Sequence, residues 1–282
     1  MAKHFTTQSQ IATLRWLGSE AMYLDTPNVS PCAHMVIGRY GGRSSSGAHK
    51  NEDGAFICCA QDASWEVAAL IDGHYSPQST SLLLDLFTDQ QDMIASLMQQ
   101  PIETAFISLQ QIIYQQLSSP AFRERCRTIR GEASCLICAR KERFLWWLCI
   151  GDCVLYLLHP ELARLGQFAL NQRSFFEWVG RSNIFDLPIP CYATGIRELR
   201  GGRNRILLLT DGLLEFGQHP FENPWYLYDH FTRKREVRDI DLRPLARTAL
   251  ERVHEEGGLD SATLLLWDIE NPQSPTWASS PA

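Results

Sequence analysis

The stretch "ALIDGHYSPQ", residues 69 to 78, ends an apolar run with a carboxylate, a glycine and an imidazole in succession. The run from Val67 to Ile71 is typical of a buried strand. Asp72 and Gly73 are also a common turn pair, because glycine adopts positive φ and aspartate hydrogen-bonds to its own backbone. A plain turn and a functional strand end are therefore both open at this point of the chain.

Acidic residues stand at the ends of other predicted strands as well. "RILLLTDGLLEF" ends an apolar run at Asp211, and Asp260 precedes "SATLLLWDI". Asp152 separates two apolar runs in "CIGDCVLYLL", and Glu52 and Asp53 directly precede "GAFICCA". If these strand ends converge, they form a ring of carboxylates whose repulsion and desolvation require compensating cations. The alternative is that each carboxylate only caps its own turn.

The residue types in this pattern indicate which ion would bind. Carboxylate and carbonyl oxygens are the ligands that Mg²⁺ and Mn²⁺ prefer. A zinc site is the competing interpretation, because Cys135, Cys138, Cys149 and Cys153 have CxxC and CxxxC spacing. However, "SCLICA" reads as a strand, in which positions three apart face opposite sides. We therefore expect these cysteines to be small buried side chains rather than zinc ligands.

Composition narrows the class of protein. The chain has 282 residues, of which 45% are hydrophobic and 21% charged, as in ordinary globular proteins. Its formal net charge of -6 disfavours a nucleic-acid partner. Nine cysteines, an odd number, fit reduced thiols. The N-terminal segment is polar, and no run approaches the roughly 18 apolar residues of a membrane span, so we expect a cytoplasmic protein without membrane association.

Strands and helices are grouped along the chain rather than strictly alternating, which favours an α+β layered fold. Apolar residues at helical spacing predict helices over 80–99, 101–117 and 243–256. Residues 1–30 are an N-terminal extension or a first strand, 31–270 form the main domain, and 271–282 read as a loose tail. The predicted strands are 54–60, 66–71, 133–139, 143–150, 153–158, 205–210 and 261–269.

Taken together, these segments resemble the metal-dependent Ser/Thr protein phosphatases of the protein phosphatase 2C (PPM) family, of bacterial type. "NEDGAF" is similar to the first acidic motif of the family, "ALIDGH" to its DGH motif and "CIGDCVLYLL" to its GDS motif. "RGEASCLICA" stands where the family has a Gly-Ser-Thr-Ala segment. "LLLTDGLLEF" and "GLDSATLLL" are similar to the ASDG-type and closing Asp-Asn motifs. The motifs occur in family order over residues 35 to 268.

The resemblance implies a four-layer α-β-β-α sandwich with two central, mainly antiparallel sheets. It also implies two Mn²⁺ or Mg²⁺ ions at one end of the sandwich, with room for a third, weaker one. Asp72 would bridge both ions, Gly73 would give a backbone carbonyl, and Asp211 and Asp260 would bind one of the ions. Glu52 and Asp53 would act through metal-bound waters. Asp152 matches a residue that helps to hold the third ion in bacterial relatives.

The implied activity is hydrolysis of phosphoserine and phosphothreonine in proteins by a metal-activated water. The substrate would be a phosphoprotein, and a cognate Ser/Thr kinase pathway would supply it. His74 could protonate the leaving oxygen, since an imidazole titrates near neutral pH. A structural histidine at a strand end is the alternative for this residue.

One departure from the family concerns the substrate phosphate. Where the family usually has an arginine, five residues before the acidic-motif aspartate, this chain has Ala48. Lys50 and Arg43 are the nearest cations that could hold the phosphate. Two other functions therefore stay open: a pseudophosphatase that binds partners, and a phosphatase of small phosphoesters.

Overall fold

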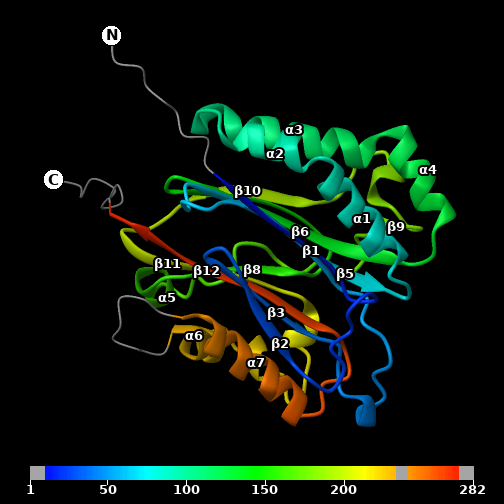
Figure 1. Cartoon of the computed structure of the whole chain (residues 1–282), viewed down its shortest axis with the longest axis vertical. Coiled ribbons are helices and arrows are strands. Elements are labelled where there is room, and N and C mark those ends of the chain that lie inside the picture. Colours follow the sequence, from blue (N-terminus) through cyan, green and yellow to red (C-terminus); the bar gives the residue numbers. More distant parts are fainter. Residues whose placement is uncertain (1–9, 233–240, 273–282) are drawn as a thin grey trace.

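The computed structural model describes residues 10–232 and 241–272 of the chain. Two antiparallel sheets lie face to face, and helices cover the outer face of each (Figure 1). This arrangement is the four-layer α-β-β-α sandwich that the sequence motifs imply, so the predicted fold class is confirmed.

The first sheet has the strand order β1-β4-β5-β6-β7-β10, with β9 paired to β6. The second sheet has the order β2-β3-β12-β11-β8. The first contains β1 (Ile11–Leu17), β4 (Gly54–Ala60), β5 (Trp65–His74), β6 (Glu132–Lys141), β7 (Phe144–Ile150), β9 (Val179–Gly180) and β10 (Ala193–Glu198). The second contains β2 (Asn28–Cys32), β3 (Met35–Tyr40), β8 (Val154–Leu158), β11 (Gly202–Leu209) and β12 (Ala262–Asn271).

Helices α1 to α4 lie over the first sheet, and α6 and α7 lie over the second (Figure 1). Their bounds are α1 (Gln78–Asp89), α2 (Gln91–Met98), α3 (Ile102–Ser118), α4 (Pro120–Thr128), α6 (Pro224–Thr232) and α7 (Arg243–Glu255). A short α5 (Pro160–Arg164) follows β8, and 3-10 turns occur at η1 (Ser44–Ser46), η2 (Ile184–Asp186), η3 (Asp211–Leu213) and η4 (Pro220–Glu222). Among the described residues, no helix is both long and apolar enough to cross a membrane.

All the segments predicted as strands are strands, and the helices predicted over 101–117 and 243–256 are confirmed as α3 and α7. The single helix predicted over 80–99 is wrong, because two helices, α1 and α2, meet there at Gln90. Gln90 has φ -96° and ψ 2°, which redirects the chain although the residue is neither glycine nor proline. Helix α4 gave no sequence signal, since only Phe122 and Cys126 of its nine residues are buried.

The core has three apolar layers, one between the sheets and one under each set of helices. In β7, Trp146 packs under the helices and Trp147 between the sheets. This is the two-sided burial expected from that apolar run. In β6, Cys135 and Cys138 likewise face different layers. These two thiols cannot converge on one ion, and both are free.

Near the N-terminus, Ile11–Leu17 forms β1, which pairs with β4 as an edge strand of the first sheet. Residues 1–9 lie outside the described residues, as do residues 273–282 of the predicted tail. The boundaries proposed from the sequence, 1–30, 31–270 and 271–282, stay a prediction.

Strand register brings the acidic strand ends to one end of the sandwich. In the first sheet, Gly54 pairs with Ile71, and Asp72 pairs with Ser134. In the second sheet, Leu209 pairs with both Val154 and Leu264. The acidic strand ends therefore gather at the same edge of the sandwich. They precede β4, β8 and β12, end β5, or follow β11.

Candidate metal centre

Asp72 lies near the end of β5, where the strand leaves the core. Its carboxylate is buried, and Oδ2 has no hydrogen-bond partner. The neighbouring Gly73 is packed so closely that a Cβ there would lie 2.5 Å from the carbonyl oxygen of Glu52. The Asp-Gly pair therefore serves close packing between β5 and the segment before β4, rather than a simple turn.

Asp53 joins the two sheets. Its Oδ2 accepts hydrogen bonds from Thr263 Oγ1 at 2.6 Å and from Thr210 Oγ1 at 3.2 Å. Thr210 follows β11 and Thr263 lies in β12, so both donors come from the second sheet. The other oxygen, Oδ1, is buried without a hydrogen-bond partner.

Asp211 opens the 3-10 turn η3, and its Oδ1 is also buried without a partner. A Cβ on the next residue, Gly212, would lie 1.9 Å from the carbonyl oxygen of Ser261, so only glycine fits there. This close approach brings the segment before β12 beside Asp211. Asp260 in that segment is exposed, and its Oδ1 accepts a hydrogen bond from the backbone N–H of Ser261 at 2.8 Å.

Burial and mutual repulsion make these carboxylates hard to ionise. Burial, then repulsion by Asp211, Asp53 and other carboxylates, raises the pKa of Asp72 well above its usual range. Burial also raises the pKa of Asp53 well above its usual range, against the effect of the Thr263 hydrogen bond. Burial and the charges of Asp152 and Asp260 raise the pKa of Asp211 to about 6.

Unpartnered, buried oxygens on Asp53, Asp72 and Asp211 are the kind of donors that a hard divalent cation needs. A bound cation would reverse the electrostatic cost of ionising all three groups. The residues present therefore fit Mg²⁺ or Mn²⁺ and do not fit Zn²⁺, which favours nitrogen and sulfur ligands.

Asp152 and His74 complete the cluster on the side of β7 and β8. Ligand atoms of Asp72, His74 and Asp152 all lie within 4.8 Å of one another. Asp152 Oδ1 accepts a hydrogen bond from Ser134 Oγ at 2.5 Å. His74 Nε2 lies 4.0 Å from Asp72 Oδ1, and its ring meets Trp178 edge to face at 4.5 Å between centroids. The imidazole thus stands at the rim of the centre.

Glu52 is buried beside the centre but forms an ion pair with Lys50. Both residues line a cavity of about 410 Å³ together with Tyr75, Gln78 and Arg130. Lys50 therefore stands at an opening next to the acidic cluster. Arg43 does not line this cavity, and its backbone N–H donates to the Gly258 carbonyl at 2.8 Å. Ala48, at the position of the missing arginine, is buried.

Arg173 is a member of the centre that the sequence did not reveal. Its Nη2 lies 2.6 Å from Glu215 Oε1, 3.3 Å from Asp211 Oδ2 and 3.8 Å from Asp152 Oδ2. It belongs to a segment between Asp152 and Asp211 that matches no motif, so no sequence signal pointed to it. Thr210 and Thr263 were also missed, although a hydroxyl residue close to each strand-end aspartate was a usable signal.

Comparison with known proteins supports the fold. No protein-family model and no curated protein matches the sequence. The chain is similar to the structure of a bacterial serine phosphatase, with a TM-score of 0.58 and 16% identity over 86% of this chain and 99% of that one. It is also similar to PppA, a key regulatory component of T6SS in Pseudomonas aeruginosa, with a TM-score of 0.57 and 16% identity over 83% of this chain and 97% of PppA. A third similar structure is the catalytic domain of the serine threonine protein phosphatase PstP in complex with two manganese ions, with a TM-score of 0.53 and 13% identity over 91% of this chain and 98% of that domain.

These alignments span nearly the whole of each solved domain, with TM-scores of 0.53 to 0.58. The chain has the protein phosphatase 2C fold of bacterial serine/threonine phosphatases.

Proposed function

We propose that this protein is a metal-dependent phosphatase that hydrolyses phosphoserine and phosphothreonine in proteins. The observation that carries the proposal is the set of unpartnered oxygens on Asp53, Asp72 and Asp211, buried together at one end of this fold. The manganese ions of the PstP domain, which has the same fold, support a two-ion centre here. Either Mn²⁺ or Mg²⁺ suits an all-oxygen ligand set.

We assign Asp72, the carbonyl of Gly73, Asp211 and Asp260 to direct metal contacts. Glu52 and Asp53 would orient bound water, and Thr210 and Thr263 hold Asp53 in place for that task. When bound, two divalent ions supply an activated water near neutral pH and offset charge on the phosphoryl group. The residues of the chain would hold the ions, orient the ester and donate a proton to the leaving group.

His74 is the group that we assign to that proton. Its Nε2 is buried without a hydrogen-bond partner, while the side chain as a whole is about a third exposed (35%) at the rim of the centre. The edge of the ring is held against Trp178. An imidazole at this rim could donate a proton to the serine or threonine oxygen as the phosphorus–oxygen bond breaks.

Lys50 is the cation that this geometry favours for the substrate phosphate, ahead of Arg43. It lines the cavity beside Glu52, and Arg130 adds a second positive charge to the same cavity. A phosphoprotein segment that enters there would meet both cations, of which Lys50 also pairs with Glu52. A protein substrate also implies an opposing Ser/Thr kinase, which we propose as the wider partner.

Assays on two substrates test the proposal. We expect the protein to hydrolyse a phosphothreonine peptide and p-nitrophenyl phosphate with Mn²⁺ or Mg²⁺, and to lose both activities in EDTA. Asp72→Asn is the matched inactive control. Hydrolysis that survives exhaustive EDTA treatment would contradict the metal-dependent mechanism. Mn²⁺ binding without hydrolysis of either substrate would indicate a pseudophosphatase, and activity on small phosphoesters alone would indicate that substrate class.

A further inference from the structure

Arg173 brings a permanent positive charge into the acidic centre. Its guanidinium contacts Glu215 and Asp211 and lies near Asp152, while most of its side chain is buried (17% exposed). A guanidinium stays protonated at any pH that the protein tolerates. This side of the centre therefore contains one permanent cation supplied by the chain itself.

Hydrogen bonds hold the backbone on both sides of Arg173, so the side chain starts from an ordered position. Two residues before it, buried Asn171 accepts a hydrogen bond from Leu155 N at 2.8 Å and donates one to the Cys153 carbonyl at 2.8 Å. One residue after it, Ser174 N donates to the Gly151 carbonyl at 3.1 Å. These contacts attach the segment to the strand β8 and to the turn that carries Asp152.

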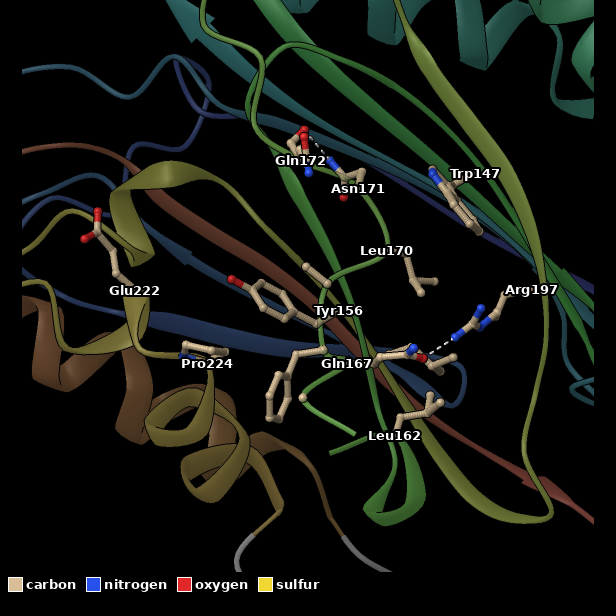
Figure 2. A pocket seen from close by; sticks show the side chains of 14 residues that line it. Trp147, Tyr156, Leu162, Gln167, Leu170, Asn171, Gln172, Arg197, Glu222 and Pro224 are labelled. Atoms are coloured by element: carbon tan, nitrogen blue, oxygen red, sulfur yellow. Dashed lines mark hydrogen bonds between the residues drawn. The ribbon is translucent and has the colours of Figure 1, made fainter. Parts of the chain in front are cut away.

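The segment that leads to Arg173 lines the cavity drawn in Figure 2. Residues 166–172 form one wall of a cavity of about 640 Å³, and Asn171 and Gln172 stand together at one end of it (Figure 2). Leu170 N donates to the Leu155 carbonyl at 2.8 Å, so the wall pairs with β8 immediately before it reaches Arg173. Arg173 thus follows directly on backbone that is hydrogen-bonded to β8.

The carboxylate oxygens of the centre divide into two sets. Oδ1 of Asp53, Oδ2 of Asp72 and Oδ1 of Asp211 are buried and without hydrogen-bond partners. The second oxygen of Asp211 accepts from Arg173, and both oxygens of Asp152 are engaged, one by Ser134 and one by the nearby guanidinium. The first set is open to metal ions, and the second set already has a cation.

We propose that Arg173 replaces a metal ion on the Asp152 and Glu215 side of the centre, so that divalent ions bind on the side of the open oxygens and none binds beside Asp152. The inference rests on the proposed metal-dependent function. It differs from the expectation, implied by the family resemblance, that Asp152 helps to hold a third, weaker ion. Arg173 acts on ion number and affinity and is a positioning residue, since it lies against metal-binding carboxylates.

Counting bound Mn²⁺ tests the inference. Isothermal titration with Mn²⁺ alone should give two ions per wild-type chain. Arg173→Met removes the charged guanidinium and keeps an unbranched stem of four atoms, and we expect it to bind one additional ion. It should also bind the first two about tenfold more tightly, because a nearby repulsive charge is gone. Arg173→Lys keeps the charge and should bind two ions, as the wild type does.

Arg200→Met is the matched control. Arg200 is similarly buried (21% exposed) and pairs with Glu161 at 2.7 Å, but it stands at the opposite end of β11 from Asp211. Its loss should leave the Mn²⁺ count unchanged. Circular dichroism checks that each variant is folded, and the wild-type count tests the inference even if Arg173→Met does not fold.

The outcomes separate the two proposals. A wild-type chain that binds no Mn²⁺ defeats the proposed metal-dependent function, and this inference with it. A wild-type chain that binds three ions overturns the inference alone. The same holds if a folded Arg173→Met variant binds two ions with wild-type affinity.

Discussion

Thr263 in β12 donates a hydrogen bond from Oγ1 to Oδ2 of Asp53, at 2.6 Å, across a separation of 210 residues. The donor belongs to the second sheet, and the acceptor precedes the first strand of the central hairpin in the other sheet. Both groups are buried. The carboxylate is therefore oriented only when the two sheets are docked, which ties the state of the metal centre to the sandwich itself.

Removing this hydroxyl should weaken metal binding. The hydrogen bond from Thr263 favours the ionised form of Asp53, so Thr263→Val makes the carboxylate harder to ionise. We expect about tenfold weaker Mn²⁺ binding and a loss of about 1–3 kcal/mol in the free energy of unfolding. Calorimetric titration and urea unfolding measure the two effects. Thr104→Val, which removes an exposed hydroxyl from the start of α3, should change neither.

Asp211 and Asp260, which follow β11 and precede β12, should respond differently to neutralisation of their charge. Asp211 is buried among like charges, so Asp211→Asn should raise the Tm of the metal-free protein at pH 8 by about 2–4 °C while it strongly weakens Mn²⁺ binding. Asp260 is exposed, so Asp260→Asn should weaken Mn²⁺ binding without a change in Tm. Unchanged Mn²⁺ affinity in both variants would show that the ligand assignment is wrong.

Stability of the metal-free protein should fall as pH rises. Burial and repulsion raise the pKa of Asp211 to about 6 from 3.8, and burial also raises the pKa values of Asp53 and Asp72 well above their usual range. In this range the folded state binds more protons than the unfolded state, so the free energy of unfolding decreases with pH. The contribution of Asp211 is complete below about pH 4 and is lost as pH rises through about 6.

Thermal unfolding at pH 5 and pH 8, with and without Mn²⁺, measures this effect. The metal-free protein should have the lower Tm at pH 8, and Mn²⁺ should remove the difference, because metal binding requires the ionised carboxylates. Asp211→Asn should show a smaller decrease than the wild type. A metal-free Tm that rises from pH 5 to pH 8 would be inconsistent with these pKa shifts.

His74→Gln should affect substrates according to their leaving groups. A serine or threonine alkoxide needs a proton as it leaves, whereas p-nitrophenolate is stable without one. We therefore expect kcat to fall about 10²-fold on a phosphothreonine peptide and to change little on p-nitrophenyl phosphate. An equal fall on both substrates would mean that His74 acts on the metal ions or on the fold, and not on the leaving group.

Lys50→Ala should raise KM for a phosphothreonine peptide about threefold to tenfold and leave kcat nearly unchanged, since a charge-assisted contact to phosphate is lost. Arg43→Ala should have a smaller effect, because Arg43 does not line the cavity that Lys50 lines. Ala48→Arg should lower KM, although insertion into a buried position will cost stability. If none of the three variants changes kcat/KM, the metal ions alone hold the phosphate.

Several features of this protein followed from the sequence by itself. The strands around Trp146 and Trp147 were predictable because two-sided burial produces a continuous apolar run. The positions of Asp72, Asp152 and Asp211 at strand ends followed from the same local pattern. The opposite facing of Cys135 and Cys138 followed from the two-residue period of a strand.

Tertiary structure alone decided which carboxylate oxygens stay open. Thr263 engages one oxygen of Asp53 from 210 residues away, and Arg173 engages one oxygen of Asp211 from 38 residues away. The break between α1 and α2 at Gln90, the exposure of Asp260 and the burial of Ala48 were decided in the same way. Local periodicity reports which face of an element is buried. The partner of a charged group depends on which distant segments the packed sheets bring together. A local sequence pattern holds no information about those distant segments.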